Sequence, residues 1–152
     1  MRARDLAEPY TFVTTDDDAI DAARMLAEQS LPALLVLDSD GQPYAIVPGS
    51  QIIRQFIPAY IAEDPLLAGV VDERNDAEVA ERLTGLTVAE WVPRQRYLPP
   101  VVGPDARPME VAALNARSHC PLVAVVERDG TQVALLGTVT AARFMQHFVG
   151  AP

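Results

Sequence analysis

The chain has 152 residues, 49% of them hydrophobic, and carries a formal net charge of −9. This composition excludes a disordered protein, and the acidic surplus argues against a nucleic-acid partner, because phosphate backbones bind basic patches. No apolar run reaches the length of a membrane span, the N-terminus lacks an apolar signal core, and a single cysteine excludes an internal disulfide. We therefore expect a cytoplasmic protein without membrane insertion.

The first elements along the chain are a lead-in turn, a short strand and a helix. The lead-in is Arg4-Asp5-Leu6, and residues 12–14 are expected to be extended. Asp16 is then expected to cap a helix, because an acidic side chain can accept hydrogen bonds from the free amides of the first turn. The apolar stripe of this helix is predicted at Ile20, Ala23 and Ala27.

A hairpin and a closing helix follow. Pro32 ends the first helix and opens an apolar strand at 34–37. Asp40-Gly41 has the composition of a tight hairpin turn, which predicts a return strand at 44–47. A closing helix comes next, and its apolar face is predicted to contain Ile52, Ile53, Phe56 and Ile57.

Residues 58–86 form an insert without a counterpart at the C-terminus. The segment Asn75–Glu78 has the pattern of a capping box, which predicts a short helix ending near Gly85. The insert is too apolar for a free linker, so we expect it to pack on the core or on a partner. The apolar residues concerned are Leu66, Leu67, Val70 and Val71.

The remaining chain repeats the order of the first 57 residues. Thr87–Glu90 is a second capping box and opens a lead-in like that of Arg4–Leu6. When Asp16–Gly41 is placed over Asp105–Gly130, Ala23 meets Ala112, Pro32 meets Pro121 and both Asp-Gly turns coincide. The corresponding elements are a strand at 101–102, a cap at Asp105, a helical stripe of Met109, Ala112 and Ala116, strands at 122–126 and 133–139, and a closing helix with Phe144, Met145, Phe148 and Val149.

The repeated pattern resembles the CBS domain, and the pair resembles a Bateman module. The residues that carry the resemblance are Leu31-Pro32-Ala33-Leu34, its counterpart Cys120-Pro121-Leu122-Val123, the two Asp-Gly turns and the junction Leu136–Arg143. The resemblance implies an α+β fold of two βαββα CBS repeats related by pseudo-twofold symmetry. We predict the first repeat at residues 1–57, the insert at 58–86 and the second repeat at 87–152.

The resemblance also implies a ligand cleft at the junction between the return strand and the closing helix. In the family a hydroxyl there contacts ligand phosphate, and an aspartate contacts an adenosine ribose. The hydroxyl corresponds to Thr140, while Arg143 occupies the aspartate position; in the first repeat Pro48 and Gln51 stand at these places. An anion is expected to prefer the second repeat, anchored by Thr140 and Arg143. The ligand-binding set predicted in this way is Val101, Pro121, Val139, Thr140, Arg143 and Gln51.

Other chemistry has weaker signals. Arg94 and Arg96 either meet a phosphate or carboxylate in the cleft or are solvated at a surface turn. Cys120 is expected to be a buried, inert thiol, and neither it nor the two histidines has metal-ligand spacing. The run Asp16-Asp17-Asp18 is expected to be a solvated helix N-terminus, since it lacks the spacing of a calcium loop.

The predicted function is that of a stand-alone regulatory module and not of an enzyme, because no constellation of acid, base or nucleophile is visible. It is expected to bind a small anionic metabolite between the repeats and to modulate a partner enzyme or transporter. An adenine nucleotide is a candidate ligand, and no other cofactor is assigned. Homodimerisation through the closing helices is also expected. The alternative is a ligand-free structural or dimerisation module with degenerate sites.

Overall fold

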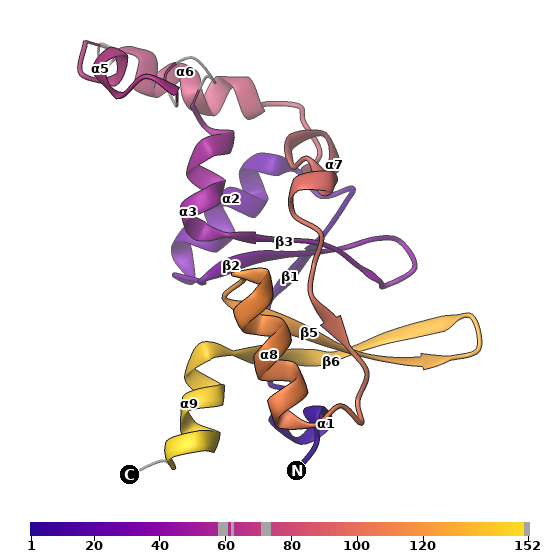
Figure 1. Ribbon diagram of the computed structural model, residues 1–152. Coiled ribbons are helices and arrows are strands. Elements are labelled where there is room, and N and C mark those ends of the chain that lie inside the picture. Colours follow the sequence, from indigo (N-terminus) through magenta and orange to yellow (C-terminus); the bar gives the residue numbers. More distant parts are fainter. Residues whose placement is uncertain (58–60, 62, 71–73, 151–152) are drawn as a thin grey trace.

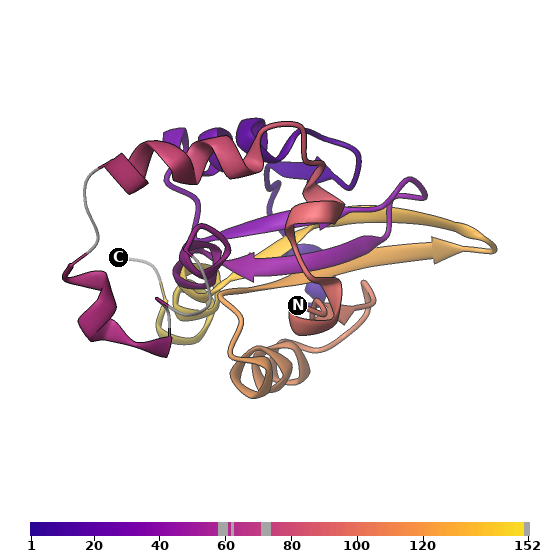
Figure 2. The same cartoon turned by 90° about the horizontal axis from the view of Figure 1, so that it is seen from above.

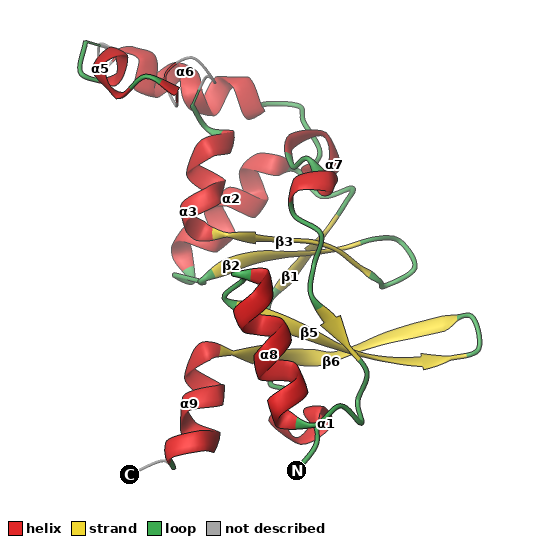
Figure 3. Cartoon of the chain, in the orientation of Figure 1, coloured by secondary structure: helices red, strands yellow, loops and turns green. Residues whose placement is uncertain are grey.

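The computed structural model describes residues 1–57, 61, 63–70 and 74–150 and contains two three-stranded sheets with helices on their outer sides (Figure 1, Figure 3). The first half comprises α1 (Ala3–Leu6), β1 (Phe12–Thr14), α2 (Ala19–Glu28), β2 (Ala33–Leu37), β3 (Pro43–Pro48), α3 (Gly49–Ile52) and the 3-10 turn η1 (Ile53–Gln55). The insert contains α5 (Pro65–Ala68) and α6 (Arg74–Leu83).

The second half repeats this order. It comprises α7 (Val88–Trp91), the 3-10 turn η2 (Arg94–Arg96), β4 (Val101–Val102), α8 (Pro108–Ser118), β5 (Leu122–Asp129), β6 (Gln132–Thr140) and α9 (Ala141–Val149). In each sheet the first strand pairs in parallel with the second, and the second pairs antiparallel with the third. The predicted α+β fold of two βαββα units is therefore confirmed. The β5–β6 hairpin is longer than β2–β3 and projects beyond it (Figure 1).

The two sheets pack against each other through one face of each. Strand β2 is buried on both faces: Leu34 and Val36 contact the helices of the first half, whereas Leu35 joins a cluster between the sheets. In β5 the alternation is the same, because Val123 faces the helices and Leu122 faces the other sheet. The sheets are stacked in Figure 1 and overlap when seen from above in Figure 2.

Each lead-in helix packs on the opposite repeat. Leu6 of α1 belongs to the core beneath β5 and β6, and the amide and carbonyl of Glu8 both bond to Thr138 on β6 at 2.9 Å. Conversely, α7 packs in the core of the first half, where the Val88 amide donates to the Asp17 carbonyl at 2.8 Å. The boundaries at 57/58 and 86/87 stay a prediction, and the exchanged lead-ins connect the two halves in space.

The helix caps differ from the sequence-based prediction. Asp16 and Asp105 do not cap their helices: Asp18 caps α2 by accepting from the Asp21 amide, and α8 begins after Arg107, whose amide donates to Glu110. Both starts lie two residues later than predicted because Asp16 and Asp105 lie in the turn between the first strand and the helix. The run 16–18 is exposed, as expected for a solvated helix N-terminus. The capping box at Thr87 and Glu90 is confirmed.

The predicted helical stripes are confirmed in part, because Ile20, Ala23 and Ala112 are partly buried and pack against the cores. In α2 the buried residues are Ala19 and Ala22, while Ala27 is exposed; in α8 Val111 is buried, while Met109 and Ala116 are exposed. The face that packs on the core therefore overlaps the predicted stripe in each helix without coinciding with it. Because alanines occur on several faces of α2, the sequence pattern did not show clearly which face of this helix packs on the core.

The insert divides into a packed part and an exposed part. The predicted helix ending near Gly85 is confirmed as α6, and Leu83 at its end is buried in the first core. A capping box was predicted to begin at Asn75 and Asp76, but the side chains of these two residues, and residue Val71, lie outside the described part of the structure. Leu66 and Val70 are largely exposed and do not pack on the described core. Among the described residues, no helix combines the length and apolar composition that crossing a bilayer requires.

Candidate functional site

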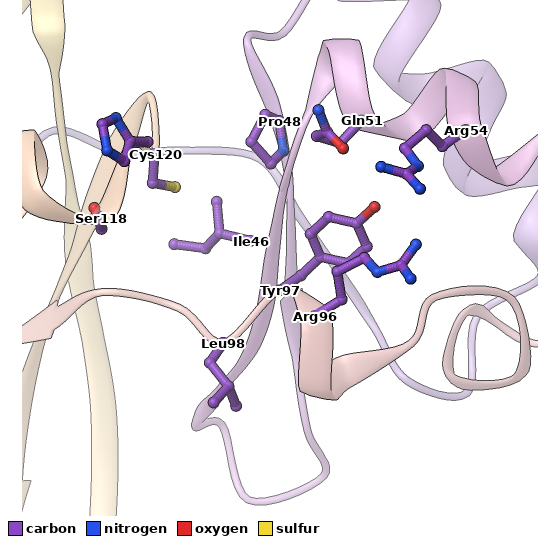
Figure 4. A pocket seen from close by; sticks show the side chains of 10 residues that line it. Ile46, Pro48, Gln51, Arg54, Arg96, Tyr97, Leu98, Ser118 and Cys120 are labelled. Atoms are coloured by element: carbon purple, nitrogen blue, oxygen red, sulfur yellow. The ribbon is translucent and has the colours of Figure 1, made fainter. Parts of the chain in front are cut away.

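A cavity of about 470 Å³ opens at the end of β3, where the first repeat meets parts of the second (Figure 4). Its walls come from three segments: the β3–α3–η1 junction, the residues after η2, and the loop between α8 and β5. The described residues that line it are Ile46, Pro48, Gln51, Arg54, Arg96, Tyr97, Leu98, Ser118, His119 and Cys120. The cavity thus lies at the junction that the family resemblance indicated, but in the first repeat.

The first wall is set by the end of β3. Pro48 occupies the N-cap position of α3 and offers no side-chain hydrogen bond, and the next amide, that of Gly49, donates to the Pro32 carbonyl at 3.0 Å. This helix start therefore does not present its first amide to the cavity. Gln51 and Arg54 follow one turn apart, so polar recognition on this wall depends on their side chains.

The second wall is held in place by Tyr97. Its side chain is buried, its carbonyl accepts from the Ile46 amide at 3.2 Å, and its hydroxyl accepts from Gln55 Nε2 at 3.1 Å. These bonds fix the segment after η2 against β3. The two neighbouring arginines are separated by this arrangement: Arg96 lines the cavity, whereas Arg94 stacks on Tyr44 at 5.0 Å from the ring centroid.

The third wall comes from the second repeat. His119 caps the end of α8 in the left-handed region, with φ of 54°, and Ser30, two residues after the end of α2, also has a positive φ, of 49°. Cys120 follows as a buried residue whose carbonyl accepts from Asn115 Nδ2 at 2.8 Å. Burial raises the pKa of the Cys120 thiol above its ordinary value, which agrees with the expectation of a buried, unreactive cysteine.

The charge in the cavity is positive. Within the described part of the chain, neither Arg54 nor Arg96 forms a salt bridge, and none of the lining residues is acidic. In a chain with a net charge of −9, two arginines without acidic partners at one opening form a local site of opposite sign. Such a site can bind an anion through charge-assisted hydrogen bonds.

The residues predicted to bind an anion in the second repeat make hydrogen bonds within the protein instead. Thr140 caps α9 by accepting from the Arg143 amide at 3.2 Å, which confirms the predicted helix start. The guanidinium of Arg143 donates through Nε to the Leu6 carbonyl at 3.2 Å and through Nη2 to the Asp5 carbonyl at 3.1 Å. Arg143 therefore joins α9 to the end of α1.

The six predicted ligand-binding residues are thus divided over the molecule. Only Gln51 lines the cavity described above. Val139 is fully buried in the second core beside Thr140, and Pro121 is half-buried at the start of β5. Val101 lies on β4 and borders a separate depression with Arg4. Arg54 and Tyr97 were missed, although the spacing of three residues between Gln51 and Arg54 placed both on one helical face.

A buried polar atom that has no partner in the described part of the chain lies on β6. Thr138 corresponds to Ile46, because the amide of each donates to a carbonyl of a neighbouring segment: Thr138 to Glu8, and Ile46 to Tyr97. Because Val139 faces the helices, the alternation along β6 directs Thr138 to the opposite face. Its hydroxyl is buried and has no hydrogen-bond partner among the described residues.

Comparisons with known proteins agree with this architecture. A CBS domain model matches residues 3–57. The structure of a CBS domain-containing protein of unknown function from Kribbella flavida is 40% identical, with 98% of this chain and 99% of that chain covered and a TM-score of 0.82. The CBS-pair protein CBSX2 from Arabidopsis thaliana has 16% identity and a TM-score of 0.71, with 97% and 94% of the two chains covered. No curated protein matches the sequence.

A second structure of CBSX2 contains AMP; it is 17% identical to this chain, covers 97% of it and 96% of its own length, and has a TM-score of 0.66. Together with the two stacked βαββα units, these similarities define a tandem CBS fold. The chain belongs to the CBS domain-containing proteins.

Proposed function

We propose that this protein is a regulatory CBS-pair module that binds a small anionic metabolite in the cavity of the first repeat. The observation that carries the proposal is the pair of arginines, Arg54 and Arg96, at a cavity without acidic residues among its described lining. Its volume of about 470 Å³ lies in the range of roughly 300–1,000 Å³ that is usual for small-molecule sites. An adenine nucleotide is a candidate, and AMP in the related CBSX2 structure supports that choice.

The cavity also suits a regulatory role. Its walls include Gln51 from the first repeat and Ser118 from the second, so an occupant would contact both repeats at once. A ligand shifts a conformational equilibrium by as much as its affinity differs between the two states, and a site shared by two units provides such a difference. The proposed consequence is a change in the relative position of the repeats that a partner enzyme or transporter detects, without catalysis by this chain.

The sequence-based prediction locates the anion at Thr140 and Arg143, and it stays a prediction. We favour the first cavity because the Arg143 guanidinium already donates to two carbonyls, whereas Arg54 and Arg96 have no salt-bridge partner in the described residues. The two locations differ in the variants that should weaken binding.

The test is a thermal-shift screen of nucleotides and anionic metabolites, followed by titration of any hit against three variants. A ligand that binds only the native state adds about 2.7 kcal/mol of stability at a hundredfold excess over its Kd. Arg96→Gln should weaken affinity about tenfold. Arg94→Gln is the matched control and should leave it unchanged, because Arg94 stacks on Tyr44 outside the cavity. A loss of affinity in Arg143→Ala alone would return the site to the second cleft.

If no compound in the screen shifts the melting temperature, the proposal is contradicted. That result would favour the alternative of a ligand-free structural or dimerisation module.

A further inference from the structure

The polar groups of the cavity gather at one end. Figure 4 shows the guanidinium groups of Arg54 and Arg96 on the same side of the cavity, with the Tyr97 hydroxyl between them. The Tyr97 hydroxyl accepts a hydrogen bond from Gln55 Nε2 at 3.1 Å, so its own proton is available to a further acceptor. Two charged forks and one hydroxyl therefore act as donors toward the same region.

The opposite end of the cavity carries apolar side chains beside the polar Ser118. Ile46 and Leu98 lie on the far side from the guanidinium groups in Figure 4, together with the Cys120 thiol. Burial keeps this thiol neutral, because it raises its pKa. The occupant is thus expected to be amphipathic, with its charge at the arginine end and an apolar body at the Ile46 end.

The number of donors distinguishes between classes of anion. A carboxylate offers two oxygens, whereas a phosphate monoester offers three terminal oxygens and matches the forked geometry of arginine. Two guanidinium groups and a hydroxyl converging on one region suit the three oxygens of a phosphate better than one carboxylate. Their mutual repulsion is relieved most by a dianion.

The described lining of the same cavity lacks the carboxylate that usually accepts from sugar hydroxyls. Within the described lining there is no carboxylate that could accept from two neighbouring ribose hydroxyls, and Gln51 supplies one amide oxygen. The middle of an occupant is therefore held less specifically than its two ends.

Given the proposed function, on which this rests, we infer that the first cavity binds a phosphomonoester with an apolar body. Arg54, Arg96 and Tyr97 hold the phosphate, and the neighbouring ribose hydroxyls of a nucleotide make no essential contact. The specificity is set by the phosphate and the apolar end.

Calorimetric titration with four probes tests this inference: AMP, 2′-deoxy-AMP, adenosine and phenyl phosphate. AMP and 2′-deoxy-AMP should bind within about threefold of each other, adenosine at least about tenfold more weakly, and phenyl phosphate measurably. Arg54→Gln and Arg96→Gln should each weaken AMP binding about tenfold, and Tyr97→Phe should weaken it by a smaller factor with the fold intact. Arg94→Gln should change nothing.

Two results would overturn the inference and leave the proposed function standing. One is adenosine binding as tightly as AMP, and the other is a loss of tenfold or more for 2′-deoxy-AMP. If AMP affinity is unchanged in Arg54→Gln and Arg96→Gln but is lower in Arg143→Ala, the proposed location in the first cavity is wrong. If none of the four probes binds, while the wider screen finds another anionic ligand whose affinity depends on Arg96, only the ligand class fails. If neither the calorimetric titration nor the thermal-shift screen detects binding, the inference and the proposed function are both wrong.

Discussion

At the scale of single residues, Gly137 determines how closely the N-terminal segment can approach β6. Its φ is +152°, and a Cβ atom at this position would lie 2.5 Å from the backbone oxygen of Glu8. That oxygen accepts from the Thr138 amide, so the close approach is part of the bridge between the lead-in and the second sheet. Only glycine permits both the backbone conformation and this distance.

Gly137→Ala should therefore destabilise the protein by about 1–3 kcal/mol. Urea denaturation of this variant, compared with Gly103→Ala, provides the measurement. The control has open space around its added Cβ, with nothing within 4 Å, and should stay close to the wild type. Equal stability of both variants would show that Glu8 moves aside without cost.

The buried hydroxyl of Thr138 leads to the opposite expectation. A buried polar group without a hydrogen bond lowers stability, and Oγ1 of Thr138 has no partner among the described residues. Thr138→Val keeps the branched shape and should raise the free energy of unfolding by about 1–2 kcal/mol. Thr14→Val on β1 is the control, because that side chain is only half-buried and water can reach its hydroxyl. A loss of stability in Thr138→Val would reveal a partner for the hydroxyl.

At the scale of elements, Arg143 is the connection between α9 and the lead-in helix α1. Its guanidinium donates to the carbonyls of Asp5 and Leu6, which lie at the C-terminal end of α1, where a positive charge is favourable. Arg143→Ala should lower stability by about 1.5–3 kcal/mol and increase amide exchange in residues 3–8. Hydrogen–deuterium exchange checks the location of the effect.

The control for this variant is Arg117→Ala, in the exposed last turn of α8. It removes the same side chain from a site without a hydrogen bond to α1 and should leave exchange in residues 3–8 unchanged. If Arg143→Ala also leaves that exchange unchanged, the lead-in is held by Leu6 and the Glu8 bridge alone.

The order of elements was predictable from sequence, whereas their faces and caps were not. Proline and Asp-Gly signals are local, so the positions of β2, β5 and both hairpins followed from them directly. Three consecutive aspartates at 16–18 offered equivalent caps, and the choice of Asp18 depends on the turn that Asp17 stabilises by accepting from the Thr14 amide. Tertiary contacts decided between candidates that were locally similar.

The candidate site shows the same division. Gln51 was predicted from the family junction, whereas the sequence left Arg96 either in the cleft or solvated at a surface turn; the structure places both in the lining. Their meeting in one cavity depends on the exchange of α7 to the first repeat and on the approach of Ser118 from the second, and both are long-range events. The engagement of Arg143 by α1 depends on the reverse exchange, so a sequence comparison between repeats could not reveal it.

At the scale of the whole molecule, both closing helices lie on one side. Figures 1 and 2 show α3 and α9 at the same end of the stacked sheets, on the left of both views. This end of the molecule is apolar at several exposed positions: Ile53, directly after α3, is 58% exposed, and Met145 and Val149 of α9 are 59% and 82% exposed. Exposed apolar surface shared by two pseudo-symmetric elements suits a twofold contact between identical chains, in which the same patch serves both partners.

We therefore expect a homodimer at micromolar concentration, with α9 at its centre. Met145→Asp should convert it to a monomer, because a twofold contact brings each introduced carboxylate near its own copy in a desolvated interface. The matched control is Met109→Asp, which changes the same residue type at 68% exposure on α8, away from this end of the molecule, and should remain dimeric. Sedimentation velocity distinguishes the two masses. A monomeric wild type at micromolar concentration would contradict the prediction, and a dimer that survives Met145→Asp would move the contact away from α9.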